Sequence, residues 1–164
     1  MKALRALTLA LTGLGALAPT ALGAAEKGQP RSMLEASNLK KALYCMNLLE
    51  NRSDLEASHR LDVLRRECFA EIYIQHAPHV PDGRDAVLSL FAARYERYPE
   101  MAMDIKRAAA NGDLVWIHLH VKETPEARGR AVVNIFRMED GRFAEHWNVV
   151  QAVPETSAND NTMF

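Results

Sequence analysis

The chain has 164 residues, of which 20 are basic and 21 acidic, and 48% are hydrophobic. This length fits one domain, and the proportions of charged and hydrophobic residues are those of an ordinary globular protein. The balanced charge excludes a strongly basic nucleic-acid-binding surface, and two cysteines are too few for a disulfide-dense scaffold.

The first residues have the pattern of a secretory signal peptide. Lys2 and Arg5 precede an apolar run over residues 6–18, and small residues lead to a cleavage site after Gly23 or Ala25. The run falls short of the ~20 residues that span a bilayer, so we expect no stable membrane insertion after cleavage. The sequence predicts a signal peptide over 1–23, a flexible lead-in over 24–36 and a domain over 37–164. We expect the mature chain to be periplasmic or secreted.

Three amphipathic helices are predicted in the first half of the domain. The first begins after Asn38, a residue type that caps helices, and the second ends near Cys68. The third spans about 85–98 and stops at Pro99. Cys45 and Cys68 lie on the apolar sides of the first two helices, either as two small core residues or as a disulfide that joins them.

The second half has the pattern of β-strands. Residues 72–74 are expected to be extended, and four strands follow over 103–109, 114–121, 130–138 and 142–150. Asn111-Gly112 and Asp140-Gly141 are typical of tight hairpin turns. Helices followed by a sheet predict an α+β fold, with helices packed on one face of a curved antiparallel sheet.

The turn at Asp140-Gly141 predicts a pairing register in which Glu139 lies opposite Arg142. Alternation then places a mixed set on one face of the sheet: Val133, Ile135, His146, Asn148 and Val150. The other face carries a more aromatic set: Asn134, Phe136, Phe143, Glu145, Trp147 and Val149. Two apolar faces need two covers, so the second face predicts a homodimer. A β-bulge would shift this register and exchange the two faces.

Two pairs of polar residues lie on these apolar strands. His118 and His120 share one face of their strand, as do His146 and Asn148 of theirs. Burial of such groups requires partners, so the two pairs and His76 predict a shared polar pocket; the alternative is that one pair faces solvent. A neutral imidazole in such a pocket can take a proton from carbon next to a carbonyl. A second imidazole or an amide can then stabilise the enolate oxygen.

A metal site is a weaker interpretation of the same residues. His118, His120, Glu123 and His146 vaguely match a cupin-type ligand set, but Glu123 is an odd number of residues from His120 and should face the other way. Half of the chain is helical in pattern, which also disfavours a cupin. We therefore expect neither a metal nor a cofactor, and keep a His-cluster metal protein as a third alternative.

Three stretches together resemble one known family. They are Tyr73-Ile74-Gln75-His76-Ala77-Pro78 with Asp82-Gly83, then Glu139-Asp140-Gly141-Arg142-Phe143-Ala144-Glu145-His146-Trp147-Asn148, and the tail from Ser157 to Phe164. Over roughly residues 38–164 the chain resembles the SnoaL-like proteins of the nuclear-transport-factor-2-like superfamily. The resemblance implies a cone-shaped α+β fold that encloses a pocket and is usually dimeric through the outer face of the sheet.

The resemblance also implies a class of chemistry. Relatives include polyketide cyclases that close a ring by aldol condensation without a cofactor, as well as isomerases, lyases and proteins that only bind ligands. This family commonly has an aspartate where the chain has Asn148, and an asparagine where it has Ala77. An asparagine cannot act as a general base, so the proton transfer is expected of histidines instead.

The sequence thus predicts a cofactor-independent acid/base enzyme that acts on a small carbonyl compound. The alternative is a non-catalytic module that binds a small ligand in the same pocket. The expected catalytic residues are His118, His120 and Asn148. The expected substrate contacts are His76, His146, Tyr73, Val133 and Ile135.

Overall fold

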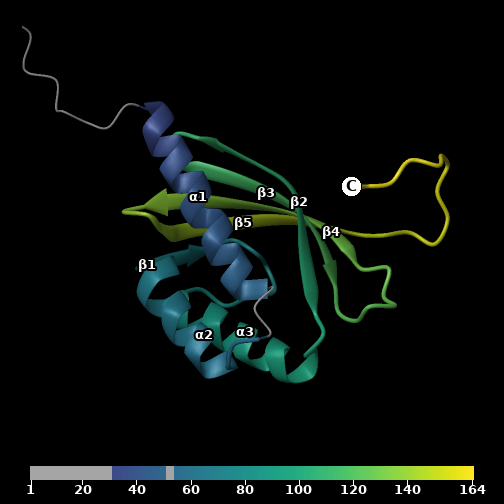
Figure 1. Cartoon of the computed structure of the whole chain (residues 1–164), viewed down its shortest axis with the longest axis horizontal. Helices are drawn as coiled ribbons and strands as arrows, with labels where there is room; N and C mark the ends of the chain where they lie inside the picture. Colours follow the sequence, from purple (N-terminus) through teal and green to yellow (C-terminus); the bar gives the residue numbers. More distant parts are fainter. Residues whose placement is uncertain (1–30, 51–53) are drawn as a thin grey trace, which may run out of the picture.

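The computed structural model describes residues 31–50 and 54–164, which form helices followed by a sheet (Figure 1). The helical elements are α1 (Arg31–Glu50), α2 (Ala57–Val63), the π-helical turn η1 (Leu64–Cys68) and α3 (Arg84–Arg97). The strands are β1 (Phe69–Gln75), β2 (Ala102–Asn111), β3 (Leu114–Lys122), β4 (Arg130–Glu139) and β5 (Arg142–Ala152). The predicted α+β class is confirmed. Within the described ranges, no helix is both long and apolar enough to cross a bilayer.

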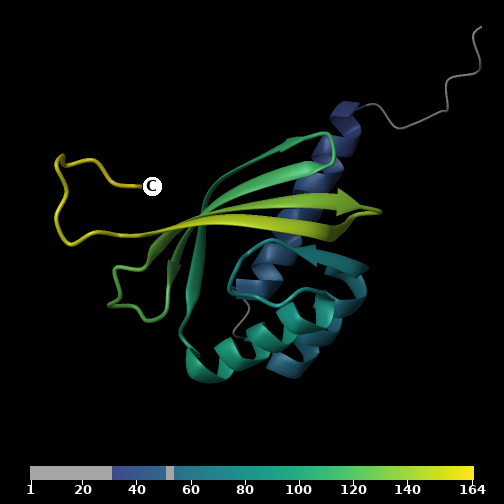
Figure 2. The same ribbon diagram turned by 180° about the vertical axis from the view of Figure 1, so that it is seen from behind.

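The five strands form one sheet in the order β1-β5-β4-β3-β2. Neighbours are antiparallel except β1, which runs parallel to β5 and makes the sheet mixed. Helix α1 lies across one face of the curved sheet, with α2 and α3 beside its end (Figure 1). The reverse view shows the strands in front of α1, so this second face carries no described helix (Figure 2). The arrangement gives an inner, helix-covered face and an outer face.

Helix α1 begins at Arg31, seven positions before the predicted cap Asn38. The reason is tertiary. The Glu35 carboxylate accepts the Gly112 N–H at 2.8 Å, and the Asn38 side-chain amide donates to the Gly112 carbonyl at 3.2 Å. These bonds hold the first turns of α1 on the β2–β3 hairpin. The predicted flexible lead-in is therefore wrong for residues 31–36; the rest of it and the predicted signal peptide lie outside the described residues.

The hairpins follow the predicted turn signals with one shift. Asp140 and Gly141 form the two-residue turn between Glu139 and Arg142, as predicted. The β2–β3 turn is Gly112 and Asp113, one residue later than expected, because Asn111 pairs with Leu114 as the last residue of β2. Positive φ angles at both turn glycines match the left-handed conformations that tight hairpin turns require.

A β-bulge in β5 changes the face of most residues in the last hairpin. Met138 pairs with Phe143, whereas Arg137 pairs with Glu145, so Ala144 is an extra residue without a partner in β4. Beyond it, His146 lies opposite Phe136 rather than opposite Ile135. The predicted faces are therefore wrong past the bulge. The inner face carries Val132, Asn134, Phe136, His146, Asn148 and Val150, all of which line one cavity.

The core fills the space between the inner face and the helices. Phe136 stacks on Phe143 with ring centroids 3.9 Å apart, and both are buried. These two phenylalanines were expected on the dimer-forming face, and that expectation is wrong. Trp147 and Val149 do lie on the outer face, where Val149 is 66% exposed.

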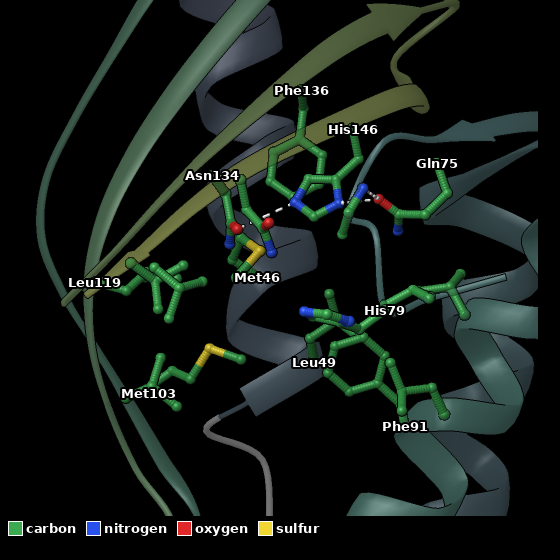
Figure 3. Close-up of a pocket in the computed structure, with 18 of the residues that line it drawn as sticks. Met46, Leu49, Gln75, His79, Phe91, Met103, Leu119, Asn134, Phe136 and His146 are labelled. Carbon is green, nitrogen blue, oxygen red and sulfur yellow. Dashed lines mark hydrogen bonds between the residues drawn. The ribbon is translucent and has the colours of Figure 1, made fainter. Parts of the chain in front are cut away.

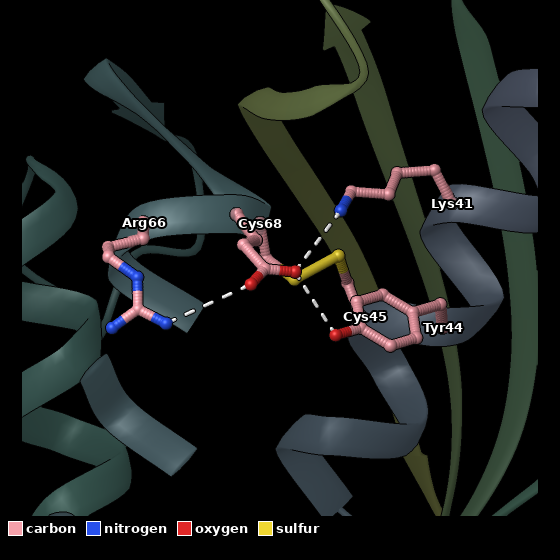
Figure 4. Close-up of a disulfide and its surroundings, with 6 residues drawn as sticks. Lys41, Tyr44, Cys45, Arg66 and Cys68 are labelled. Carbon is pink, nitrogen blue, oxygen red and sulfur yellow. Dashed lines mark hydrogen bonds and ion pairs between the residues drawn. A yellow bond between two sulfur atoms is a disulfide. The ribbon is translucent and has the colours of Figure 1, made fainter. Parts of the chain in front are cut away.

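A disulfide joins the first two helical segments, as one of the two interpretations proposed. Cys45 of α1 and Cys68 of η1 are fully buried, with Cα atoms 5.6 Å apart. Next to Cys68 in the chain, the Glu67 carboxylate accepts a hydrogen bond from the Tyr44 hydroxyl at 3.1 Å and lies 3.9 Å from the Lys41 ammonium (Figure 4). The Cys45–Cys68 disulfide holds α1 against the start of β1, and so fixes the position of one wall of the cavity.

Candidate functional site

A cavity of about 470 Å³ lies between the inner face of the sheet and the helices. Its helix wall comes from Met46 and Leu49 of α1 and from Val87, Leu90 and Phe91 of α3. Its sheet wall is also largely apolar, with Leu119 and Met103 on the strands far from β1 (Figure 3). The size and the mostly apolar lining are those of a small-molecule site.

The polar groups of the cavity gather on the sheet wall around His146 of β5. Nδ1 of His146 lies 2.9 Å from Oε1 of Gln75, and Nε2 lies 3.0 Å from Oδ1 of Asn134 (Figure 3). Asn148 also lines the cavity and pairs with Asn134 across the two strands. The His146 ring stacks on Phe136, with centroids 4.7 Å apart. This places one imidazole and three side-chain amides at one region of an apolar chamber.

Burial keeps His146 neutral. The residue is only 9% exposed, and desolvation, with a smaller repulsion from His76, lowers the pKa of its ring from 6.5 to about 4. A neutral imidazole has one N–H. The Gln75 carbonyl oxygen already accepts the Ala77 N–H at 2.9 Å, so its position is fixed and Nδ1 carries the proton toward it. Nε2 then holds a lone pair, which bonds best when the Asn134 amide presents its NH2 group.

Tyr73 lies beside this group, also from β1. The Gln75 side-chain amide donates to its hydroxyl at 3.5 Å. The hydroxyl is buried, and burial raises the pKa of Tyr73 above its usual value. Tyr73 is therefore a hydrogen-bonding wall residue that stays protonated at neutral pH.

Two arginines and no acidic residue complete the described lining. Arg130 forms an ion pair with Glu123 at the end of the sheet. Arg94 of α3 has its guanidinium 5.3 Å from the centroid of the Phe91 ring, which is itself a wall residue. His79, from the loop after β1, also borders the cavity (Figure 3).

His118 and His120 lie on the outer face of the sheet, away from the cavity. The prediction that they share a chamber with His146 and Asn148 is wrong. His118 lies 3.1 Å from the Arg107 guanidinium, and burial with the nearby positive charges of Arg107 and Lys106 lowers its pKa. The hydrogen-bond partner of His120 also lies outside the cavity: its Nε2 is 2.8 Å from the backbone carbonyl oxygen of Arg128.

The side chain of Phe164 covers this pair of histidines. Its ring centroid lies 4.1 Å from that of His120 and 5.7 Å from that of His118. The C-terminal segment therefore turns back onto the outer face. His118 and His120, the predicted base and acid, pack against Phe164 there and do not face a substrate site.

Of the five expected substrate contacts, the structure brings Tyr73 and His146 to the cavity and not the other three. His76 lies on the outer side, stacked on Trp147 at 4.6 Å and within 2.8 Å of a Glu145 oxygen. The Arg137 guanidinium, and next His76, hold the pKa of Glu145 below its usual value. Val133 and Ile135 are on the outer face because the bulge at Ala144 exchanged the two faces.

Sequence reasoning missed Gln75, Asn134, Arg94 and His79. Gln75 follows Tyr73 by two positions on one strand, so alternation alone would have placed it on the same face. Asn134 required knowledge of the bulge. Arg94 and His79 come from a helix and a loop, whose orientation toward the cavity depends on packing. Over the described side chains, residues 31–49 and 54–164, no three residues of the metal-binding types cluster.

Comparison with known proteins agrees with this architecture. A family model of the SnoaL-like domain matches residues 51–146. The chain belongs to the SnoaL-like family. The residues matched by the family model include His146 and most of the strands that line the cavity. A separate comparison with curated proteins found no similar protein.

Solved structures share the SnoaL-like fold at low sequence identity. A protein from Agrobacterium tumefaciens str. C58, provisionally named an isomerase of the SnoaL-like family, is 11% identical with a TM-score of 0.58, covering 71% of this chain and 98% of that one. A provisionally named SnoaL-like polyketide cyclase from Jannaschia sp. CCS1 is 18% identical with a TM-score of 0.58, covering 75% and 91%. A provisionally named ketosteroid isomerase from Kribbella flavida DSM 17836 is 14% identical with a TM-score of 0.57, covering 76% and 85%. At these identities they establish the fold.

Proposed function

We propose that the protein binds a small, largely apolar carbonyl compound in the cavity and moves a proton within it without a cofactor. The observation that carries the proposal is the neutral His146 imidazole on the wall of an apolar chamber, next to the amides of Asn134 and Asn148. The provisional names of structural relatives, isomerase and polyketide cyclase, support the same reaction class.

In the proposed reaction His146 is the base. Its Nε2 lone pair takes a proton from the carbon next to the carbonyl once the Asn134 amide turns aside. The electron pair of that C–H bond forms the C=C bond of the enolate, and the π pair of the carbonyl moves to its oxygen. The NH2 groups of Asn148 and Asn134 donate to this oxygen. The proton returns to another carbon in an isomerisation. In a ring closure, the enolate carbon instead attacks a second carbonyl of the same molecule, and the proton held on Nε2 passes to the new alkoxide oxygen.

A pKa of about 4 leaves His146 unprotonated over the whole neutral range, so the free base is always available. The same value makes it a weak base, and the reaction therefore depends on an acidified carbon. Carbons between two carbonyl groups, or in conjugated ketones, meet this requirement. This restricts the proposal to activated carbonyl compounds.

The experiment is proton exchange in deuterated water. We would incubate the protein with a panel of cyclic ketones and dicarbonyl compounds and follow deuterium incorporation at the activated carbon by NMR. His146→Gln keeps a polar side chain without a base, and should slow the exchange by about 10²–10⁴-fold. His118→Gln, on the outer face, is the matched control and should leave it unchanged. Equal exchange in wild type and His146→Gln would refute the proposal.

One observation favours a second function, a binding module without turnover. Both ring nitrogens of His146 already lie within hydrogen-bond distance of protein amides, so the group can serve to orient a ligand. Native mass spectrometry after gentle purification distinguishes the two functions. A stoichiometric bound molecule that is not converted, together with no exchange in the panel, would favour the binding module.

We also propose that the protein is exported and forms a homodimer. The buried Cys45–Cys68 bond supports export, because structural disulfides persist in oxidising compartments such as the periplasm. The outer face with Trp147 and Val149 supports the dimer, since exposed apolar patches mark protein interfaces. Fractionation of cells that express the full chain would test the first proposal: a chain retained in the cytoplasm at full length would contradict it.

A further inference from the structure

Resting on the proposed function, we infer that the ligand of the cavity carries a carboxylate, which Arg94 binds. The ligand class is then an organic acid that has an apolar body and a carbonyl group.

The first argument is the charge of the cavity wall. The described lining contains no aspartate or glutamate, while it contains two arginines. Arg130 is neutralised by its ion pair with Glu123. Among the described side chains, those of residues 31–49 and 54–164, Arg94 has no carboxylate at ion-pair distance, and its guanidinium contacts the Phe91 ring. A cation on a low-dielectric wall concentrates anions in the cavity.

The second argument is the position of Arg94 relative to the other polar groups. It comes from α3, on the helix wall, whereas His146, Asn134 and Asn148 come from the sheet wall. A ligand between the two walls would meet a cation on one side and the imidazole with its amides on the other. An apolar body would fill the space between them, against Leu119 and Phe91 (Figure 3).

The third argument is the chemistry of the group. A guanidinium presents paired N–H donors that match a carboxylate, and such bonds are stronger than neutral ones. Phe91 is only 8% exposed and supports one side of the arginine, which limits its conformations. The Arg94 carbonyl accepts the Tyr98 N–H at 2.8 Å, which closes the last turn of α3.

The test compares acids with their neutral amides. Keto acids with an aromatic or branched aliphatic body, phenylpyruvate among them, would each be titrated by calorimetry beside the primary amide of the same compound. We expect wild type to bind at least one acid about tenfold or more tightly than its amide, in line with a charged hydrogen bond. Arg94→Gln should remove this preference by weakening the binding of the acid to about that of its amide.

Arg97→Gln is the matched control. Arg97 is on the same helix and also contacts a ring, that of Tyr98, at 5.2 Å, but it is exposed and does not line the cavity. This variant should keep the preference for the acid. Equal binding of acid and amide, a preference that survives Arg94→Gln, or no binding of any acid would overturn the inference.

The result is separable from that of the proton-exchange experiment. An acid preference that depends on Arg94, with no deuterium exchange, would leave the carboxylate inference standing and reject the catalytic proposal. Exchange that depends on His146, with no preference for acids, would do the reverse.

Discussion

Acid should destabilise the protein through His146 at a pH where its carboxylates are still ionised. The ring has a pKa of about 4 in the folded protein and 6.5 as an unperturbed group. The unfolded chain therefore binds more protons than the folded one between these values. The stability gained from the neutral, buried ring is fully present above pH 6.5 and is lost as the pH falls toward 4. The complete loss is about 3 kcal/mol, of which ~2 kcal/mol is lost by about pH 5.

Urea unfolding at a series of pH values from about 7.5 to 5 would measure this loss in the free energy of unfolding. His146→Gln removes the titrating ring, so its stability should be lower at pH 7.5 and nearly flat over the same interval. The lowered pKa of Glu145 changes the free energy of unfolding only below about the ordinary carboxyl pKa of 4.5, which is outside this interval. His118→Gln is the control for a second histidine whose pKa is lowered. Parallel curves for wild type and His146→Gln would refute the burial of a neutral ring.

Three further predictions concern the scaffold. Cys45→Ala combined with Cys68→Ala, which opens a link across 23 positions, should lower the free energy of unfolding by about 3 kcal/mol; an unchanged urea midpoint would contradict this. Gly129→Ala should cost about 2–3 kcal/mol, because φ is +74° and the new Cβ would lie 2.1 Å from the Val121 carbonyl oxygen; calorimetry that gives an unaltered Tm would show that the loop adapts. Trp147→Glu should convert the proposed dimer to a monomer by light scattering, and a wild type that is already monomeric at micromolar concentration would reject the dimer.

The sequence was sufficient for the order and type of the elements. Turn chemistry at Asp140-Gly141 is local, since it depends on the conformations that these two residues favour, and the structure has this turn as predicted. The start of α1, in contrast, depends on contacts with residues that are distant in the sequence. Residues 31–36 join the helix because Glu35 and Asn38 bind Gly112, which lies more than seventy positions away in the chain.

The faces of the last hairpin could not be read from alternation. One extra residue, Ala144, exchanges the faces of everything beyond it, and its neighbours show no turn or glycine signal. A bulge of this kind is decided by packing: Phe143 is buried beside Phe136 in the core, and the strand must bend to place it there.

The position of His118 and His120 did have a signal in the sequence. The aliphatic residues Val115, Ile117, Leu119 and Val121 alternate with them along β3 and are all buried. Four buried aliphatic side chains at alternate positions occupy the inner face, so the histidines between them must face outward. The clustering of histidines in the sequence was a weaker guide than this alternation.

The most direct test of the account is an NMR titration of the histidine ring nitrogens with a carbonyl compound from the exchange panel. Long-range ¹H–¹⁵N spectra report the protonation and hydrogen bonding of each ring separately. We predict that saturation shifts the His146 nitrogen signals, with Nε2 unprotonated before addition, and leaves those of His118 and His120 in place. Shifts at His118 and His120 with an unchanged His146 would contradict it.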